Sequence, residues 1–89
     1  MQRVSDLKTL RKWCAENPRG IVVSDKIASR TQAHSQHLSS CNMLNTHFWP
    51  KDNRTYFCYD SEKELLARAE SDGVSNRARC SRPGHNCYG

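Results

Sequence analysis

Residues 31–50, TQAHSQHLSSCNMLNTHFWP, contain no Lys, Arg, Asp or Glu, although the chain on both sides is strongly charged. They hold three of the four histidines, one of the five cysteines and many Ser, Thr, Gln and Asn side chains. An exposed helix face normally carries charges, and a buried core helix carries more aliphatic residues. We therefore expect this stretch to contact something else, which could be base edges, a protein partner or a metal.

Apolar spacing inside this stretch favours a helix. His34, Leu38, Cys41 and Leu44 recur at i, i+4, i+7 and i+10, which predicts a helix from about residue 32 to residue 45. A short helix over residues 26–30 is predicted to precede it, with a break near residue 31. The aromatic-rich runs 46–49 and 55–59 flank a Pro-Lys-Asp-Asn turn, and together they predict a β-hairpin.

Two further helices and one strand are predicted outside this region. Apolar residues at helical spacing favour a first helix that Ser5 caps and that residues 17–20 end. The β-branched run 21–23 is typical of a strand. Ser61 and Glu64 form a capping box before a further helix, and Gly73 stands where a helix C-terminal glycine is common.

The length and composition indicate one small α+β domain. Eighty-nine residues with 36% hydrophobic side chains build only a lean core, so a metal or a partner is expected to add stability. We expect a compact α+β domain over residues 1–72 and a basic Cys/His-containing tail over residues 73–89, pinned by a metal. The tail has no hydrophobic periodicity of its own, so without a metal it would be disordered.

The charge of the chain indicates the class of partner. A formal net charge of +5 and a pI near 9.2 fit double-stranded DNA or an acidic or host protein surface. The sequence has neither an apolar run of about 20 residues nor a signal-peptide h-region. We therefore expect no membrane association, a cytoplasmic location and reduced thiols.

The order of elements resembles the winged helix-turn-helix fold over residues 7–59. In that resemblance GIVVSDKIASRT supplies the first small strand and positioning helix, QAHSQHLSSCNML the recognition helix and HFWPKDNRTYFCY the wing. The recognition helix of such a fold enters the major groove and the wing touches the DNA backbone. The base-reading residues that the resemblance implies are Gln32, Ser35, Gln36 and Ser39. The phosphate contacts that it implies are Arg30, Lys51 and Arg54.

A cluster of metal-ligand residues lies in the tail. Cys80, His85 and Cys87 fall within eight residues, and Cys58 on the predicted hairpin is the natural fourth ligand of a Zn²⁺ ion. Cys41 or His47 could replace Cys58. The alternatives are a disulfide, either Cys58–Cys80 or Cys80–Cys87, or no role for these cysteines.

The function classes follow from these features. The chain contains no G-x-S-x-G, Walker A, H-E-x-x-H or G-x-G-x-x-G stretch, so we expect no enzymatic activity. The first hypothesis is a small basic DNA-binding regulator of transcription, of the phage, plasmid or bacterial operon type. The second is a protein-interaction module, a small inhibitor or adaptor, with a zinc-ordered C-terminal tail.

Overall fold

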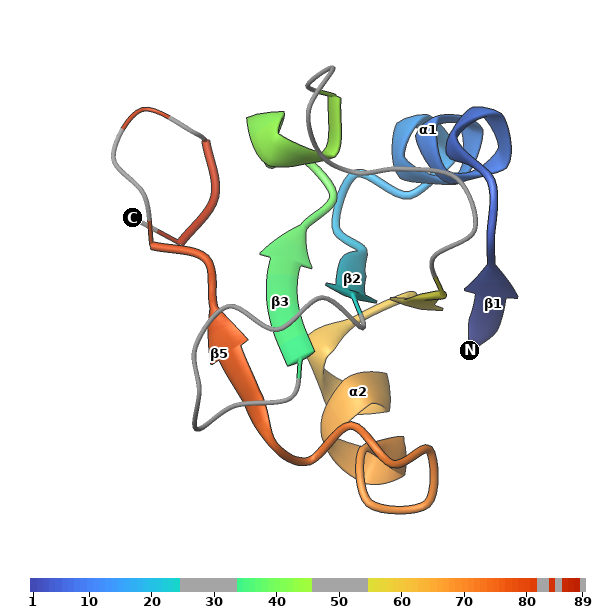
Figure 1. Ribbon diagram of the computed structural model, residues 1–89, viewed down its shortest axis with the longest axis vertical. Helices are drawn as coiled ribbons and strands as arrows, with labels where there is room; N and C mark the ends of the chain where they lie inside the picture. The colour runs from blue at the N-terminus through green and yellow to red at the C-terminus, as the bar shows by residue number, and fades with distance from the viewer. Residues whose placement is uncertain (25–33, 46–54, 82–83, 85, 89) are drawn as a thin grey trace.

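The fold is a mixed β-sheet with helices on both of its faces. A computed structural model describes residues 1–24, 34–45, 55–81, 84 and 86–88, which include two α-helices and five strands. The strands lie in the order β1-β4-β2-β3-β5, and only the β3–β5 pair is parallel (Figure 1). The strands are β1 Gln2–Val4, β2 Ile21–Ser24, β3 His34–Leu38, β4 Tyr56–Tyr59 and β5 Arg77–Arg79. The helices are α1 Leu7–Glu16, the 3-10 helix η1 Asn42–Asn45 and α2 Glu62–Arg68.

The alternation of side chains along the strands divides the core into two layers. On β4, Tyr56 and Cys58 face α1, whereas Phe57 and Tyr59 face α2. The first layer holds Leu10 and Trp13 of α1, and the second holds Leu65 of α2. The prediction of a small α+β domain is therefore confirmed, and both faces of the sheet are covered.

The two α-helices begin and end through specific local interactions. The N-cap of α1 is Asp6 and not the predicted Ser5. The Asp6 carboxylate accepts a 2.9 Å hydrogen bond from the backbone N–H of Thr9. Ser61 caps α2 as predicted, and its hydroxyl accepts from the N–H of Glu64. Gly73 follows α2 with a φ of 77°, the left-handed conformation predicted for it.

A buried tyrosine fixes the segment after α2 to the sheet. The Tyr59 hydroxyl donates a 2.9 Å hydrogen bond to Oδ2 of Asp72, which also accepts from Arg68. Burial raises the pKa of Asp72, but the hydrogen bonds from Tyr59 and Arg68 outweigh it and the net pKa lies below the usual range. Burial of Tyr59, helped by the neighbouring carboxylate, raises the pKa of its phenol.

Tyr59→Phe should remove this contact without changing the packing of the ring. We expect the urea midpoint of unfolding to fall by about half a molar at neutral pH with an unchanged m-value. The pKa of Asp72 is lower in the folded state than in the unfolded state. The ionised carboxylate therefore adds to the free energy of unfolding above the unfolded-state pKa, and this stabilisation is lost as the pH falls through the folded-state pKa. The difference between Tyr59→Phe and wild type should therefore shrink as the pH falls below the ordinary carboxyl pKa, and a constant difference would contradict this assignment.

The predicted recognition helix is wrong. Residues 34–38 form strand β3, which pairs antiparallel with β2 in a register that joins Val22 to His37 and Val23 to Gln36. Residues 42–45 form η1. The helical stripe of apolar residues was compatible with a helix, but pairing with the fully buried β2 decided the conformation. The resemblance to a winged helix-turn-helix fold therefore fails at the element that would read DNA.

The strand predicted at residues 55–59 exists as β4, but its pairing differs from the prediction. One edge of β4 pairs with β1 and the other with β2, so both edges are occupied by strands other than residues 46–49. The predicted first hairpin strand and the predicted helix over residues 26–30 lie outside the described residues. The sheet also continues past residue 72, because residues 77–79 form β5.

The described helices are short. The longer α-helix, α1, has 10 residues, and no helix in the described part of the chain is long and apolar enough to cross a bilayer.

Candidate metal centre

Four soft or borderline ligand side chains meet at one end of strand β3. One ligand atom each from His37, Cys41, Cys80 and Cys87 lies within 4.8 Å of the other three. Cys41 Sγ lies 3.4 Å from His37 Nδ1 and 3.8 Å from Cys80 Sγ. Three thiols and one imidazole form a Cys₃His set, which is a standard ligand set of structural zinc sites.

The distances within the group match a tetrahedron around a zinc ion. With Zn–S bonds of about 2.3 Å, tetrahedral geometry places two sulfurs about 3.8 Å apart. With a Zn–N bond of about 2.0–2.1 Å, it places sulfur and nitrogen about 3.6 Å apart. The Cys41–Cys80 and Cys41–His37 separations, 3.8 Å and 3.4 Å, lie close to these values. The group can therefore hold a tetrahedral metal ion with little rearrangement.

The first two ligands come from β3 and the turn that follows it. His37 lies next to the end of β3, where alternation directs its side chain to the α1 face of the sheet together with its neighbour Val22. Cys41 follows after a turn in which its N–H donates to the carbonyl of Leu38, at 2.9 Å. Its own carbonyl accepts from the N–H of Leu44, a buried core residue. Cys41 is thus held in position before η1.

The parallel strand β5 delivers the third ligand. Arg79 is the register partner of Gln36, and the N–H of Cys80 continues the ladder by donating to the carbonyl of Gln36 at 2.8 Å. Cys80 therefore reaches the level of His37. Alternation from Ala78, which pairs with Ser35, directs the Cys80 side chain to the same face as His37.

The fourth ligand lies on the tail, which returns to β3. The N–H of Leu38 donates to Cys87 Sγ at 3.2 Å, and the N–H of Tyr88 donates to the carbonyl of Cys80 at 3.1 Å. Burial raises the pKa of the Cys87 thiol, while the Leu38 N–H opposes this rise by stabilising the thiolate. Such N–H···S contacts orient a ligating sulfur from outside the metal shell.

The site is closed toward the core and partly open on the tail side. His37 is 3% exposed and Cys41 is 0% exposed, whereas Cys80 and Cys87 are half-buried. Both cysteines of the tail pack against the core layer that contains Leu10 and Trp13. Metal binding at this position would join the tail, β5, β3 and the α1 layer of the core.

A network of polar side chains supports the tail on the other face of β3. The Gln36 amide donates to the hydroxyl of Tyr88 at 2.6 Å, and its oxygen accepts from Nε of Arg77 at 2.6 Å. Arg79 lies over the Tyr88 ring, 4.9 Å from its centroid, and pairs with Glu62 of α2. The buried Gln36 side chain is therefore used to fix β5 and the tail.

Sequence reasoning identified part of this group. Cys80 and Cys87 are in it as predicted, and Cys41, the stated alternative to Cys58, takes the fourth-ligand position. His37 was not among the predicted ligands. The predicted ligand His85 and the alternative His47 lie outside the described residues.

Cys58 does not belong to the group. It lies on β4 and faces the same side of the sheet as His37, but Val22 of β2 stands between them in the register. Two interstrand spacings, about 10 Å, therefore separate their backbones. Cys58 is instead buried in the core, and burial together with the nearby Cys14 raises its pKa to about 12. It is a core residue with an unreactive thiol.

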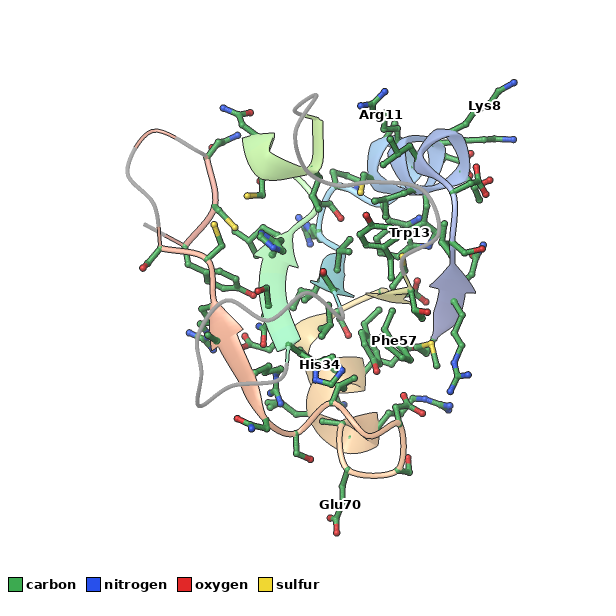
Figure 2. All side chains as sticks on the ribbon, viewed as in Figure 1. Lys8, Arg11, Trp13, His34, Phe57 and Glu70 are labelled. Atoms are coloured by element: carbon green, nitrogen blue, oxygen red, sulfur yellow. The ribbon has the colours of Figure 1, made fainter. Side chains whose placement is uncertain are left out.

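The other described histidine of β3, His34, lies on the opposite face of the sheet from His37. Three positions apart on a strand, the two side chains point to opposite faces. The His34 ring packs edge-on against Phe57, with ring centroids 6.2 Å apart and planes at 74°. His34 therefore contributes to packing on the α2 side (Figure 2).

The residues predicted to read DNA bases are buried where the structure describes them. Ser35 is 6% exposed, Gln36 2% and Ser39 6%, so these side chains are not available to a duplex. The described polar residues of the stretch instead line an interior strand of the sheet and supply two of the four side chains of the His/Cys group. The other predicted DNA contacts, Arg30, Gln32, Lys51 and Arg54, lie outside the described residues.

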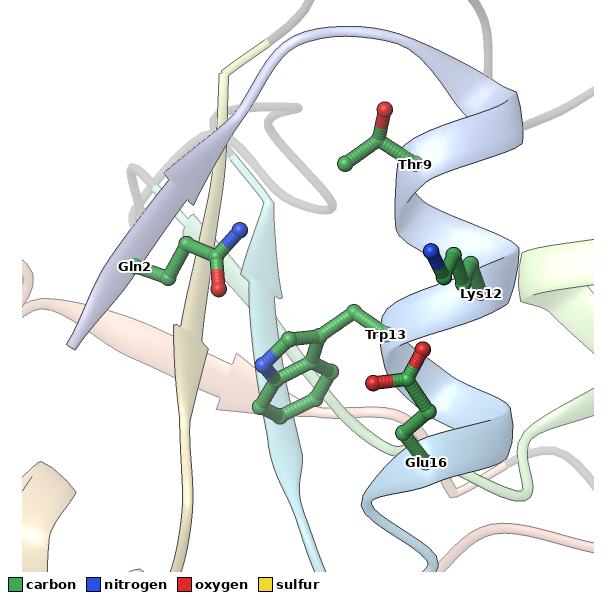
Figure 3. A pocket seen from close by; sticks show the side chains of 5 residues that line it. All are labelled: Gln2, Thr9, Lys12, Trp13 and Glu16. Carbon is green, nitrogen blue, oxygen red and sulfur yellow. The ribbon is translucent and has the colours of Figure 1, made fainter.

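A shallow groove lies apart from the four ligands. It has a volume of about 200 Å³ between β1 and α1 and is lined by Gln2, Thr9, Lys12, Trp13 and Glu16 (Figure 3). None of the four ligand residues lines it. Its mixed polar lining and small volume do not resemble a typical small-molecule site.

Comparisons with protein-family models, with curated proteins and with solved structures gave no match to this chain. Its function is therefore inferred from the geometry of the site.

Proposed function

We propose that this chain is a small binding module whose fold is closed by a structural zinc ion bound to His37, Cys41, Cys80 and Cys87. The observation that carries the proposal is the convergence of four ligand atoms within 4.8 Å from three separate parts of the chain. Thiolate-rich tetrahedral sets select zinc or iron–sulfur chemistry over magnesium and calcium, which prefer oxygen ligands. A mononuclear Cys₃His set favours zinc.

The number of ligands supports a structural role. Four protein ligands fill a tetrahedral zinc ion, whereas catalytic zinc sites keep one position for water or substrate. The metal would supply folding free energy that a lean core of 89 residues lacks. A module of this kind presents a surface to a partner.

The ligand chemistry also supports a reducing location. Three thiols this close to one another would pair readily in an oxidising compartment, and the Cys41 and Cys80 sulfurs are already 3.8 Å apart. In the cytoplasm the thiols stay reduced and available to a metal. A cytoplasmic location is therefore part of the proposal.

Metal content measured on matched variants tests the proposal. The protein purified under reducing conditions should carry one zinc per chain by native mass spectrometry and elemental analysis, and should lack the visible absorption of an iron–sulfur cluster. Cys41→Ser should lose most of this metal, because a hydroxyl is a much poorer zinc ligand. Cys14→Ser, a half-buried cysteine outside the group, is the control and should keep it. Equal metal content in the two variants would refute the site.

A further inference from the structure

The outward face of α1 carries a cluster of basic side chains. Lys8, Arg11 and Lys12 are exposed and stand at i, i+3 and i+4, which places them on one side of the helix. Arg19 is exposed just after the helix. Leu10 and Trp13 occupy the opposite side and are buried against the sheet. We call these four exposed residues the α1 basic face.

None of the ion pairs among the described residues includes the α1 basic face. They join the N-terminal amine to Glu64, Arg68 to Asp72 and Arg79 to Glu62, all around α2. The acid nearest the start of α1, Asp6, is engaged in capping Thr9. Glu16 is on the same helix and lines the groove next to Trp13 (Figure 3). Asp6 and Glu16 offset part of the charge of Lys8 and Lys12, but four basic side chains against two acidic ones leave the face with a net positive charge.

Basic side chains are in excess in the segment that contains α1. Residues 1–24 contain five basic side chains and two acidic ones, whereas residues 55–81 contain four basic and five acidic. In Figure 2 Lys8 and Arg11 extend from the end of the molecule that is opposite Glu70. The excess of basic side chains around α1 would attract an approaching polyanion to this part of the molecule.

We propose that the α1 basic face binds the phosphodiester backbone of a nucleic acid. Lys and Arg on an exposed helix are the usual source of sequence-independent phosphate contacts. The inference needs the folded domain of the proposed function, but it uses none of the metal ligands. The nucleic-acid contact then lies on α1, and not on the segment that forms the buried strand β3, where the sequence had predicted it.

The composition of the face favours a polyanion over a protein surface. Protein interfaces are centred on buried aromatic, apolar or Arg anchors surrounded by a rim. Among the described residues the exposed large hydrophobic side chain is Leu66, which lies on α2 and not on α1. Long basic side chains without an apolar anchor suit an extended row of phosphates.

Binding to labelled duplex DNA and single-stranded RNA, measured by fluorescence anisotropy between 50 and 200 mM salt, tests this inference. The two nucleic acids show which backbone the face prefers. The test variant is Lys8→Gln with Arg11→Gln. The matched control is Lys63→Gln with Arg68→Gln, which removes the same charge from the exposed side of α2; because it also breaks the Arg68–Asp72 ion pair, its thermal midpoint is measured alongside.

The test variant should bind at least about tenfold more weakly at 50 mM salt, and its log–log salt slope on DNA should be shallower by about 1.8, as expected for two lost phosphate contacts. The control should bind nearly as well as wild type. Equal losses in the two variants, or no wild-type binding at 50 mM salt, would overturn the inference. Zinc content should be unchanged in both variants. A failure of nucleic-acid binding can therefore be distinguished from a failure of the proposed zinc site.

Discussion

Removal of the metal is expected to lower the thermal midpoint by at least about 20 °C or to abolish cooperative unfolding. A ligand bound only by the folded state at about 1,000 times its Kd contributes about 4 kcal/mol, and each kcal/mol shifts the midpoint of a domain this size by about 4–8 °C. Structural zinc often contributes more than this. The loss should be measured by calorimetry or circular dichroism before and after a strong chelator under reducing conditions.

The structural reason is that the described part of the tail is otherwise held by contacts that are individually weak. It meets β3 and η1 through single hydrogen bonds, such as those from the Ser40 hydroxyl to the carbonyl of Asn86 and from Gln36 to Tyr88. Such bonds contribute about 0.5–1.5 kcal/mol each, which is close to the cost of ordering one residue. Without the metal, β5 and the tail should therefore separate from the sheet first.

Adding different ions back to the metal-free protein provides the control for the loss of stability. Added Zn²⁺ should return the transition to its original midpoint, while Mg²⁺ should not, because it prefers oxygen ligands. Amide exchange should become fast first at Cys80 and Tyr88, whose N–H groups are bonded to the carbonyls of Gln36 and Cys80. An unchanged midpoint in protein shown to be free of metal would contradict the structural role.

Gly20→Ala is expected to destabilise the domain by about 2–3 kcal/mol and to lower its thermal midpoint by about 10–20 °C. A Cβ at this position would lie 2.4 Å from Cη2 of Trp13 and 2.8 Å from the hydroxyl of Ser39. Trp13 is buried on the α1 side of the core, so its ring cannot withdraw without opening that layer. The backbone of Gly20 also accepts from the N–H of Ser39, which ties the start of β2 to the end of β3.

A second variant separates a clash from a general effect of the alanine. Trp13→Phe makes room next to position 20, so the double variant should be more stable than the sum of the two single losses predicts. Denaturant midpoints of the four proteins give this coupling free energy. Additive losses would show that the Trp13 ring is not what limits the size of residue 20.

Local signals in the sequence were sufficient for several elements. The first helix, the β-branched strand that begins at Ile21 and the capping box at Ser61 each depend on neighbouring residues, and each exists in the structure. The left-handed Gly73 belongs to the same class. In these segments local propensity and the final fold agree.

Non-local pairing accounts for the main error. The stretch from His34 to Leu44 has both helical spacing and a short alternation of side chains, and periodicity alone could not choose between them. The choice was made by β2 on one side and by the parallel strand β5, about forty residues away in the chain, on the other. Neither pairing has a local signature.

The candidate site was predictable only in part for the same reason. Cys80 and Cys87 stood out because ligand residues are dense in the tail. His37 did not, because its role depends on the parallel register that brings Cys80 to its level. The His37-x₃-Cys41 spacing was the one available local signal, and it does not by itself identify the other two ligand residues. Cys58 was chosen from a hairpin geometry that β4 does not have.

X-ray absorption at the zinc edge of the purified protein tests the metal centre most directly. The account predicts a first shell of three sulfur atoms at about 2.3 Å and one nitrogen at about 2.0–2.1 Å. The sulfur count should fall to two in any metal that Cys87→Ser retains. A wild-type shell made only of nitrogen and oxygen, or one unchanged by Cys87→Ser, would contradict a zinc ion bound by His37, Cys41, Cys80 and Cys87.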